Sequence, residues 1–176
     1  LEEEQILLRI AEMGEDAAER YKDENPIFLR VKDGADKLAD LFEASAREHG
    51  LKFETGTITV KSMDGADTTG IHTVTQGYEG PDMTGRKVVL VEDIIDTGET
   101  IAFLFEHLEQ YAPTIIKTIA LFAKEERRVV KDLEFDDIGF IVQGFVVGFG
   151  LDFDDCYREL KDLWLVLFPP YPEDSE

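Results

Sequence analysis

The 176-residue sequence contains one cysteine, Cys156, so no internal disulfide can form, and a reduced, cytoplasmic setting is the expectation. No apolar run approaches the roughly 20 residues that a membrane-spanning helix needs, and no signal-peptide pattern is present. The Gly-Lys-Ser/Thr ending of a Walker A loop and the GxGxxG of dinucleotide-binding folds are also lacking. What is present is a chain long enough for one domain with a buried core, expected over residues 1–168.

Basic residues are scarce in this chain. Lysine and arginine total 18 against 39 aspartates and glutamates, which gives a formal net charge of −21. A surface this acidic repels nucleic-acid backbones and anionic membranes, so neither is an expected partner. Two compatible explanations of the charge stay open. One is a surface that is adapted to solubility or salt, or engineered. The other is a set of carboxylates that holds a divalent cation, which then carries the phosphates of a substrate.

Apolar residues recur at helical spacing in three segments and form short runs between them. Helices are predicted over residues 6–21, 38–46 and 101–111. Strands are predicted over residues 27–31, 53–60, 71–75, 88–91, 115–122, 138–142, 145–147 and 163–167, the last three continuing the sheet. The small and polar residues 62–70 predict a mobile loop, and the Pro- and acid-rich residues 169–176 a frayed tail. This alternation predicts an α/β fold with a mainly parallel, twisted sheet flanked by helices.

The segment from Val88 to Thr100 carries the strongest chemical signal. Val88–Val91 is typical of a strand buried on both faces, and ligands of open parallel sheets bind beyond the carboxyl ends of such strands. Glu92 and Asp93 follow at that edge. Two adjacent acids suit ribose hydroxyls and a hydrated Mg²⁺.

A candidate phosphate cradle comes next, where the chain turns into a helix. The turn consists of Asp96, Thr97, Gly98, Glu99 and Thr100. Backbone N–H groups at a helix start bind anions, Gly98 allows close approach, and the threonines add hydroxyl donors. An acidic helix start capped by Thr97 or Asp96 is the plainer alternative, but it accounts for only one or two of these residues. The segment thus offers groups for a diol, a metal and a monophosphate, which are the parts of a ribose 5-phosphate.

The run Val-Glu-Asp-Ile-Ile-Asp-Thr-Gly at residues 91–98 resembles the diphosphoribosyl-binding signature of hypoxanthine-guanine phosphoribosyltransferases. The similarity extends over residues 6–167. Residues 123–128 resemble the family's next loop, 145–153 its purine-binding strand and 157–160 the segment after it. The resemblance implies a type I phosphoribosyltransferase fold with a small hood region.

The same resemblance implies a reaction of purine salvage. Ribose 5-phosphate would pass from phosphoribosyl diphosphate to a 6-oxopurine base, giving a purine nucleoside monophosphate and pyrophosphate. Hypoxanthine and guanine are the expected bases, with xanthine as a further candidate. The family also implies Mg²⁺ as cofactor, and a homo-oligomer, dimer or tetramer.

The resemblance assigns three residues to catalysis. Asp96 takes the place of the proposed general base near purine N7, Lys124 that of the donor to the exocyclic O6, and Arg158 that of the pyrophosphate-binding arginine. Phe145 would stack on the purine, and Val146 would read its edge through backbone groups. Taken without the resemblance, Lys124 is an ordinary surface lysine at a strand end, and Phe145 is a core residue.

Further positions complete the implied site. Glu92 and Asp93 would hold one Mg²⁺, and Asp152 a second that is bound by pyrophosphate. Lys32 and Gly34 match the pyrophosphate loop after the first strand. The remaining implied positions are Ser62, at the start of the mobile lid, and Arg128, which either joins Arg158 or is a solvated charge.

Three residues depart from the family pattern. Asp33 replaces a glycine of the pyrophosphate loop, Met63 replaces the lid tyrosine, and Gly144 stands where a basic residue often precedes the stacking phenylalanine. These departures keep two other interpretations open. One is a catalytically weak nucleotide-binding or regulatory module, and the other is a stability-engineered variant that retains the site. The intact acidic and basic residues favour the enzyme.

Overall fold

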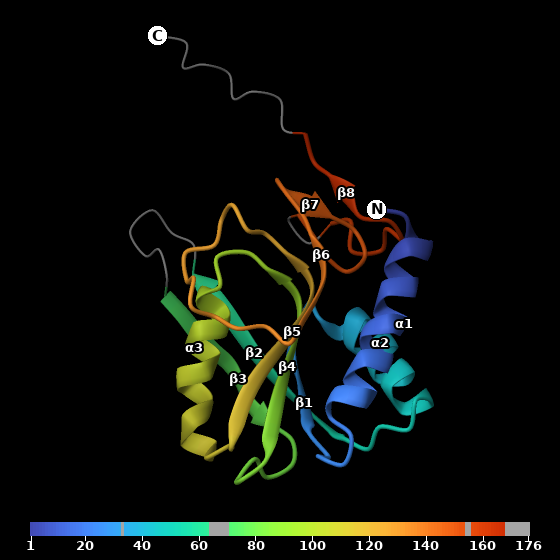
Figure 1. The fold of residues 1–176 in the computed structure, drawn as a ribbon. Helices are drawn as coiled ribbons and strands as arrows, with labels where there is room; N and C mark the ends of the chain where they lie inside the picture. The colour runs from blue at the N-terminus through green and yellow to red at the C-terminus, as the bar shows by residue number, and fades with distance from the viewer. Residues whose placement is uncertain (33, 64–70, 154–155, 168–176) are drawn as a thin grey trace.

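The computed structural model describes residues 1–32, 34–63, 71–153 and 156–167. Its centre is a six-stranded sheet in the order β3-β2-β1-β4-β5-β6 (Figure 1). The strands are β1 (Ile27–Lys32), β2 (Glu54–Met63), β3 (Ile71–Glu79), β4 (Lys87–Ile95), β5 (Ile115–Ala123) and β6 (Asp137–Ile141). Among these, β3 alone runs antiparallel to its neighbour. The mainly parallel sheet predicted from the sequence is confirmed.

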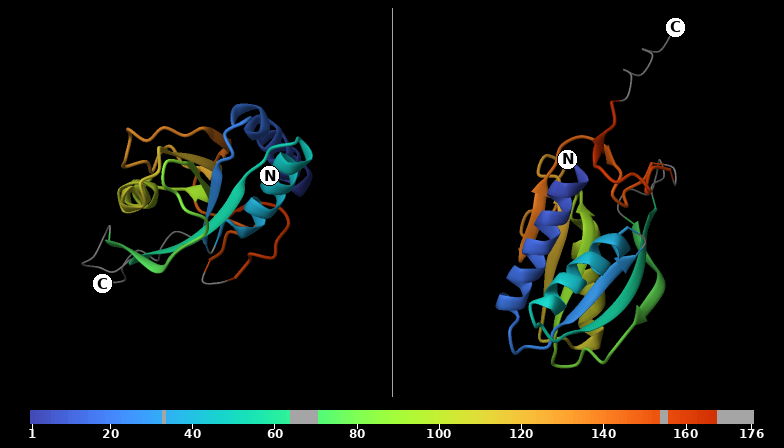
Figure 2. Two further views of the ribbon diagram at one scale, coloured as in Figure 1. Left: turned by 90° about the horizontal axis from the view of Figure 1, so that it is seen from below. Right: turned by 90° about the vertical axis from the view of Figure 1, so that its right-hand side faces the viewer.

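Helices cover both faces of the sheet. Figure 2 shows α1 (Glu3–Arg20) and α2 (Asp36–Glu48) side by side on one face, and α3 (Glu99–Leu108) lies on the other. Successive strand residues point to opposite faces, so Val89 and Val91 pack beneath α1 and α2, whereas Val88 and Leu90 pack beneath α3. This explains why β4 is apolar without interruption.

The two helices on one face approach closely at Gly14. A Cβ atom there would lie 2.5 Å from the Cβ of Ser45, so a larger residue would push α1 and α2 apart. Ser45 also donates a hydrogen bond from its hydroxyl to the carbonyl of Ala11, at 2.8 Å. The small glycine and this hydrogen bond thus join α1 to α2 on one face of the sheet.

The strands predicted over 145–147 and 163–167 do not continue the sheet. They are the short strands β7 (Val146–Val147) and β8 (Trp164–Leu165), which form a separate antiparallel pair at one end of the molecule (Figure 1). Gly144 and Gly148 have φ of +70° and +96° and turn the chain away from β6 on either side of β7.

Other boundaries differ from the sequence-based expectation. The strand β2 continues to Met63, so Ser62 and Met63 belong to it and not to the predicted loop. The helix α3 ends at Leu108, and the 3₁₀ turn η1 (Glu109–Tyr111) follows it. The rest of the predicted loop, the predicted tail and Asp33 lie outside the described residues. No helix in the described part of the chain is long and apolar enough to cross a bilayer.

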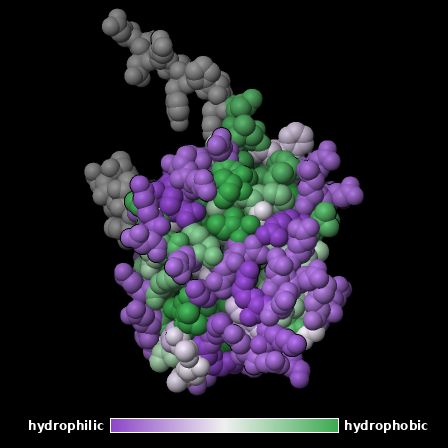
Figure 3. Space-filling view, in the orientation of Figure 1, coloured by the Kyte–Doolittle hydropathy of each residue, from purple (hydrophilic) through white to green (hydrophobic). Residues whose placement is uncertain are grey.

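The fold collects several loops at one end of the sheet. Because β1, β4 and β5 are parallel, the loops that follow them leave from the same edge. The β7–β8 pair lies at this end too (Figure 1), where the backbone N–H of Leu163 donates to the carbonyl of Leu1 at 2.9 Å. Hydrophilic residues cover most of the face seen in Figure 3, in keeping with the net charge.

Candidate active site

The end of β4 places two carboxylates next to each other in a poorly solvated position. Glu92 is 7% exposed, and its Oε1 accepts a hydrogen bond from the backbone N–H of Asp93 at 3.2 Å. The Asp93 Oδ1 accepts the N–H of Ile94 at 2.6 Å. Burial raises the pKa of Glu92 well above its ordinary value, and the neighbouring Asp93 raises it further; burial also raises the pKa of Asp93. Two negative charges held this close in a poorly solvated position repel each other, and a bound cation would offset that repulsion.

This pair suits a divalent ion that takes its other ligands from substrate and water. Mg²⁺ is usually held by one or two carboxylates together with phosphates and water molecules. Within the described ranges, no three His, Cys, Asp or Glu side chains lie together as a metal cluster. Asp152 therefore does not join Glu92 and Asp93 in one cluster.

The loop after β1 presses against the acid pair. A Cβ on Gly34 would lie 1.6 Å from Oδ2 of Asp93, and a Cβ on Gly150 would lie 3.4 Å from the Gly34 carbonyl oxygen. Arg158 donates from Nη1 to the carbonyl of Gly150 at 3.0 Å, and its Nη2 pairs with Oδ1 of Asp152 at 2.8 Å. The positive charge of Arg158 opposes the rise in the pKa of Asp93. The residues assigned to pyrophosphate from the sequence are thus brought together, with Lys32 at the end of β1 beside them in the chain.

The candidate phosphate cradle is the turn between β4 and α3. Gly98 is the N-cap of α3 with φ of +87°, so the predicted alternative of a Thr97 or Asp96 cap is wrong. Thr97 Oγ1 donates to Glu99 Oε2 at 2.9 Å and accepts the Glu99 N–H at 3.3 Å. A small cavity of about 80 Å³ opens here. It is lined by Glu92, Ile94, Ile95, Asp96, Thr97, Gly98, Thr100 and Ile101.

The loop after β5 supports this turn from behind. The backbone N–H groups of Val129 and Val130 donate to the carbonyl of Thr97, at 2.9 and 3.2 Å. A Cβ on Gly98 would lie 3.0 Å from Leu133 and 3.2 Å from Cδ of Arg128. The Arg128 guanidinium lies 4.7 Å from the ring centroid of Phe135. Arg128 therefore packs against the turn at Gly98 and over the ring of Phe135. The sequence predicted either a partner of Arg158 or a solvated charge, and neither describes this packing.

Three residues predicted to contact the base converge beside the cradle. Lys124 Nζ lies 3.5 Å from Oδ2 of Asp96 and 5.8 Å from the ring centroid of Phe145. Lys124 is 4% exposed, so the surface-lysine alternative is wrong. Phe145 is half-buried and meets the ring of Phe153 edge-on, with centroids 5.5 Å apart. Val146 follows in β7 and is buried, and its role at the base edge stays a prediction.

Asp96 is held by two cations but keeps an unsatisfied oxygen. Arg127 Nε lies 3.2 Å from its Oδ1, and Lys124 faces its Oδ2. Oδ1 is nevertheless buried, and no described group donates a hydrogen bond to it. An oxygen in this state is a good acceptor for a ligand N–H.

Sequence reasoning missed two members of the loop after β5. Arg127 lies at Asp96, and Glu126 Oε1 accepts the N–H of Gly144 at 3.1 Å, directly before Phe145. Both residues follow Lys124 within three positions, and this nearness in the sequence is the only feature that could have indicated a place at the site. Ser62 lies in β2, and its side chain is outside the described structure.

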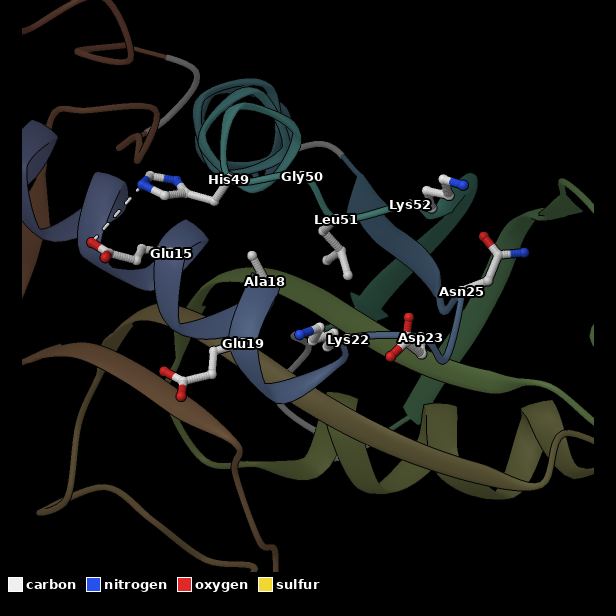
Figure 4. A pocket seen from close by; sticks show the side chains of 10 residues that line it. All are labelled: Glu15, Ala18, Glu19, Lys22, Asp23, Asn25, His49, Gly50, Leu51 and Lys52. Carbon is white, nitrogen blue, oxygen red and sulfur yellow. Dashed lines mark ion pairs between the residues drawn. The ribbon is translucent and has the colours of Figure 1, made fainter.

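A wider cavity than the one at the turn lies away from this chemistry. It measures about 610 Å³ and opens where α1 and α2 end, before β1 and β2 begin (Figure 4). It is lined by Glu15, Ala18, Glu19, Lys22, Asp23, Asn25, His49, Gly50, Leu51 and Lys52. Acidic and basic side chains are mixed on its rim, and no residue of the candidate site reaches it. The site follows the carboxyl ends of the strands, and this cavity precedes their amino ends.

Comparisons with known proteins agree with the geometry. Residues 1–154 match the phosphoribosyl transferase domain family. A hypoxanthine-guanine phosphoribosyltransferase of Lactococcus lactis is 34% identical over 90% of this chain and 84% of its own. A hypoxanthine-guanine-xanthine phosphoribosyltransferase of Tritrichomonas foetus is 32% identical over 90% and 85%.

A solved structure gives the same result for the fold. The hypoxanthine phosphoribosyltransferase of Trypanosoma cruzi, in complex with the product IMP, superposes with a TM-score of 0.84. The alignment covers 96% of this chain and 93% of that one, at 30% identity. The type I fold expected from the sequence is confirmed, and this chain belongs to the phosphoribosyltransferase family.

Proposed function

We propose that this chain transfers ribose 5-phosphate from phosphoribosyl diphosphate to a 6-oxopurine, with release of pyrophosphate and a purine nucleoside monophosphate. The observation that carries the proposal is the convergence of Asp96, Lys124 and Phe145. A 6-oxopurine needs an acceptor for its ring N–H, a donor for its carbonyl oxygen and an apolar surface for its ring, and these three side chains supply them. The relatives named for hypoxanthine, guanine and xanthine support the same class of base.

The proposed reaction needs one proton transfer. As a base nitrogen attacks the anomeric carbon, the carbon–oxygen bond to pyrophosphate breaks and pyrophosphate leaves with the electron pair. The purine then loses its N7 proton to the carboxylate of Asp96. Lys124 donates to O6, so it favours a 6-oxopurine over adenine, whose 6-amino group cannot accept that hydrogen bond.

The diphosphoribosyl group would lie between the turn after β4 and the loop after β1, which meet at the carboxyl ends of the strands. The turn from Thr97 to Thr100 would bind the 5-phosphate through the start of α3. Arg158, Lys32 and the loop at Gly34 would meet pyrophosphate. Ser62, at the end of β2, stays a prediction as part of the lid.

Mg²⁺ is the metal that we assign to this reaction. The buried pair Glu92 and Asp93 would hold one ion near the ribose, and Asp152 would meet a second at pyrophosphate. When bound, Mg²⁺ neutralises the charge of the leaving pyrophosphate. A cytoplasmic location and a homo-oligomer remain parts of the proposal that rest on the single cysteine and on the family.

A binding module with weak turnover is the second candidate, and Gly144 is the observation that favours it. A Cβ at this position would lie 2.7 Å from Cδ1 of Leu165, and the residue has φ of +70°. The basic side chain that the family often has there would therefore be strained in this chain. Near the position where the family often has a basic side chain, this chain has the negatively charged Glu126, which accepts the Gly144 N–H.

A spectrophotometric assay separates the two candidates. The full chain is given Mg²⁺ and phosphoribosyl diphosphate with hypoxanthine, guanine, xanthine or adenine in turn. The proposal expects turnover of at least one 6-oxopurine, no turnover of adenine, and complete loss of activity when a chelator removes the metal. Binding of IMP or GMP without turnover of any base would establish the binding module instead.

A further inference from the structure

The loop after β5 brings two cations to the same carboxylate, and they differ in exposure. Lys124 Nζ faces Oδ2 of Asp96 at 3.5 Å, and Arg127 Nε faces Oδ1 at 3.2 Å. The side chain of Lys124 is 6% exposed, whereas that of Arg127 is 57% exposed. Lys124 is therefore a fixed part of the pocket. Arg127 reaches Asp96 from the solvent and can leave it at little energetic cost, because exposed ion pairs are weak.

Oδ1 of Asp96 is the atom at which Arg127 and a purine would meet. The Arg127 Nε lies close to this oxygen but outside hydrogen-bonding geometry, so the buried Oδ1 accepts no hydrogen bond from the described groups. A ligand N–H that points at Oδ1 would supply the missing bond. In the proposed reaction the N7–H of the purine is that donor.

The backbone on both sides of Arg127 is anchored. Glu126 holds the Gly144 N–H at 3.1 Å, and the Arg128 guanidinium lies over Phe135 at 4.7 Å. The Arg128 N–H also donates to the carbonyl of Glu125 at 3.2 Å. Removal of Arg127 from Asp96 therefore needs only rotation of its own side chain, with the loop and Lys124 left in place.

We propose that Arg127 is a positioning residue that occupies the purine N7 position on Asp96 while the base site is empty, and that the incoming 6-oxopurine displaces it. The inference rests on the proposed function. In the empty site the ion pair keeps the Asp96 side chain directed towards Lys124. When the base binds, the guanidinium moves into solvent and the N7–H takes its place at Oδ1. The exchange makes and breaks no covalent bond.

The test measures binding of a 9-deaza-6-oxopurine, which keeps the N7–H and has carbon in place of the reacting nitrogen. Its dissociation constant is measured by calorimetry on the full chain with saturating Mg²⁺ and phosphoribosyl diphosphate. Arg127→Ala should bind the analogue about two- to fivefold more tightly than wild type, the range that an exposed ion pair contributes. Arg127→Lys should lie between them, because it keeps the charge on a shorter side chain.

A matched control removes the same charge from the same loop. Lys131 is exposed and follows Arg127 in the loop, so Lys131→Ala should leave the dissociation constant unchanged. Ionic strength gives a second measurement that a structural effect would not move. Salt screens the exposed ion pair, so the advantage of Arg127→Ala over wild type should shrink between about 0.1 and 1 M salt.

Several outcomes would overturn the role of Arg127. Unchanged or weaker binding by Arg127→Ala would do so, as would an advantage that does not change with salt. The proposed function is judged separately, by turnover of hypoxanthine in the wild type. Turnover without a gain in analogue binding refutes the Arg127 proposal alone, and a salt-sensitive gain without turnover refutes the reaction alone. If the analogue binds neither protein, both are refuted.

Discussion

Gly34 and Asp93 are so close that a β-carbon on the glycine would lie 1.6 Å from Oδ2 of the aspartate. The contact joins the loop after β1, assigned to pyrophosphate, to the acid pair after β4, assigned to the metal and ribose. An alanine at position 34 has no space unless Asp93 or the loop moves. The arrangement of the two loops therefore requires a glycine, with no side chain, at position 34.

Gly34→Ala is expected to lower kcat/KM for phosphoribosyl diphosphate by roughly 100-fold, because a displacement of about 1 Å in a catalytic group has that effect. Gly77→Ala in β3 is the matched control, since a Cβ there meets no atom within 4 Å, and its activity should be unchanged. Steady-state kinetics on both variants, with circular dichroism to verify folding, make the comparison. A fully active Gly34→Ala would mean that the contact has no part in catalysis.

Asp96→Asn is expected to lower kcat by roughly 100-fold or more while the affinity for the base changes much less. The amide keeps the shape of the side chain and a hydrogen-bonding oxygen but cannot accept the purine proton. Rate and binding are separated by kcat from saturation kinetics and by calorimetric binding of the unreactive analogue. A loss of affinity with unchanged kcat would remove the proton-accepting role from Asp96.

Lys124→Ala is expected to reduce kcat/KM for hypoxanthine about 10- to 100-fold, the range for loss of a charged hydrogen bond, and to narrow the preference over adenine. Lys117→Ala, in β5 before Lys124, removes the same charge outside the site and should alter neither quantity. The ratio of kcat/KM for hypoxanthine and adenine is the measurement. An unchanged ratio would exclude Lys124 from recognition of O6.

The sequence predicted the parts of the site that follow from strand order. Apolar runs located β4 and β5, and the parallel arrangement then required Glu92, Asp96 and Lys124 to meet at one edge of the sheet. The burial of Lys124 did not follow from its local sequence, because a lysine after a strand is normally solvated. The burial depends on how the loop after β5 packs against the turn between β4 and α3.

Long-range placements of single side chains were not predictable in this way. The pairing of Arg127 with Asp96 joins residues on different loops, and the charge runs from 124 to 128 do not indicate which cation faces inward. The β7–β8 pair was assigned to the main sheet because its residues are apolar. An apolar pattern does not reveal the left-handed φ of Gly144 and Gly148, which separate β7 from β6.

The anchor between β1 and α2 gives a prediction about stability. Glu43 is 1% exposed and accepts two hydrogen bonds from Arg30, Nε to Oε1 at 2.8 Å and Nη2 to Oε2 at 2.9 Å. These bonds raise the pKa of Arg30 above its ordinary value. Glu43→Ala should lower the free energy of unfolding by about 3 kcal/mol, because it leaves a largely buried guanidinium without its main partner.

Asp40→Ala is the control for that variant, since Asp40 pairs with the same arginine at 2.8 Å but is 70% exposed. Its effect should stay below about 1 kcal/mol. Urea unfolding at neutral pH gives both values. Equal effects of the two substitutions would contradict the view that burial, and not the number of ion pairs, sets the contribution of this anchor.

The net charge of −21 predicts that salt stabilises the fold. Carboxylates crowded on a compact surface repel each other more than they do in the extended chain, and the screening length falls from about 10 Å at 0.1 M to about 3 Å at 1 M salt. The free energy of unfolding should therefore rise when KCl is increased over this range. Urea unfolding at several KCl concentrations measures the rise, and sucrose at equal osmolality controls for general solvent exclusion. A rise as large in sucrose as in KCl, or no rise in KCl, would mean that surface repulsion does not limit the stability of this protein.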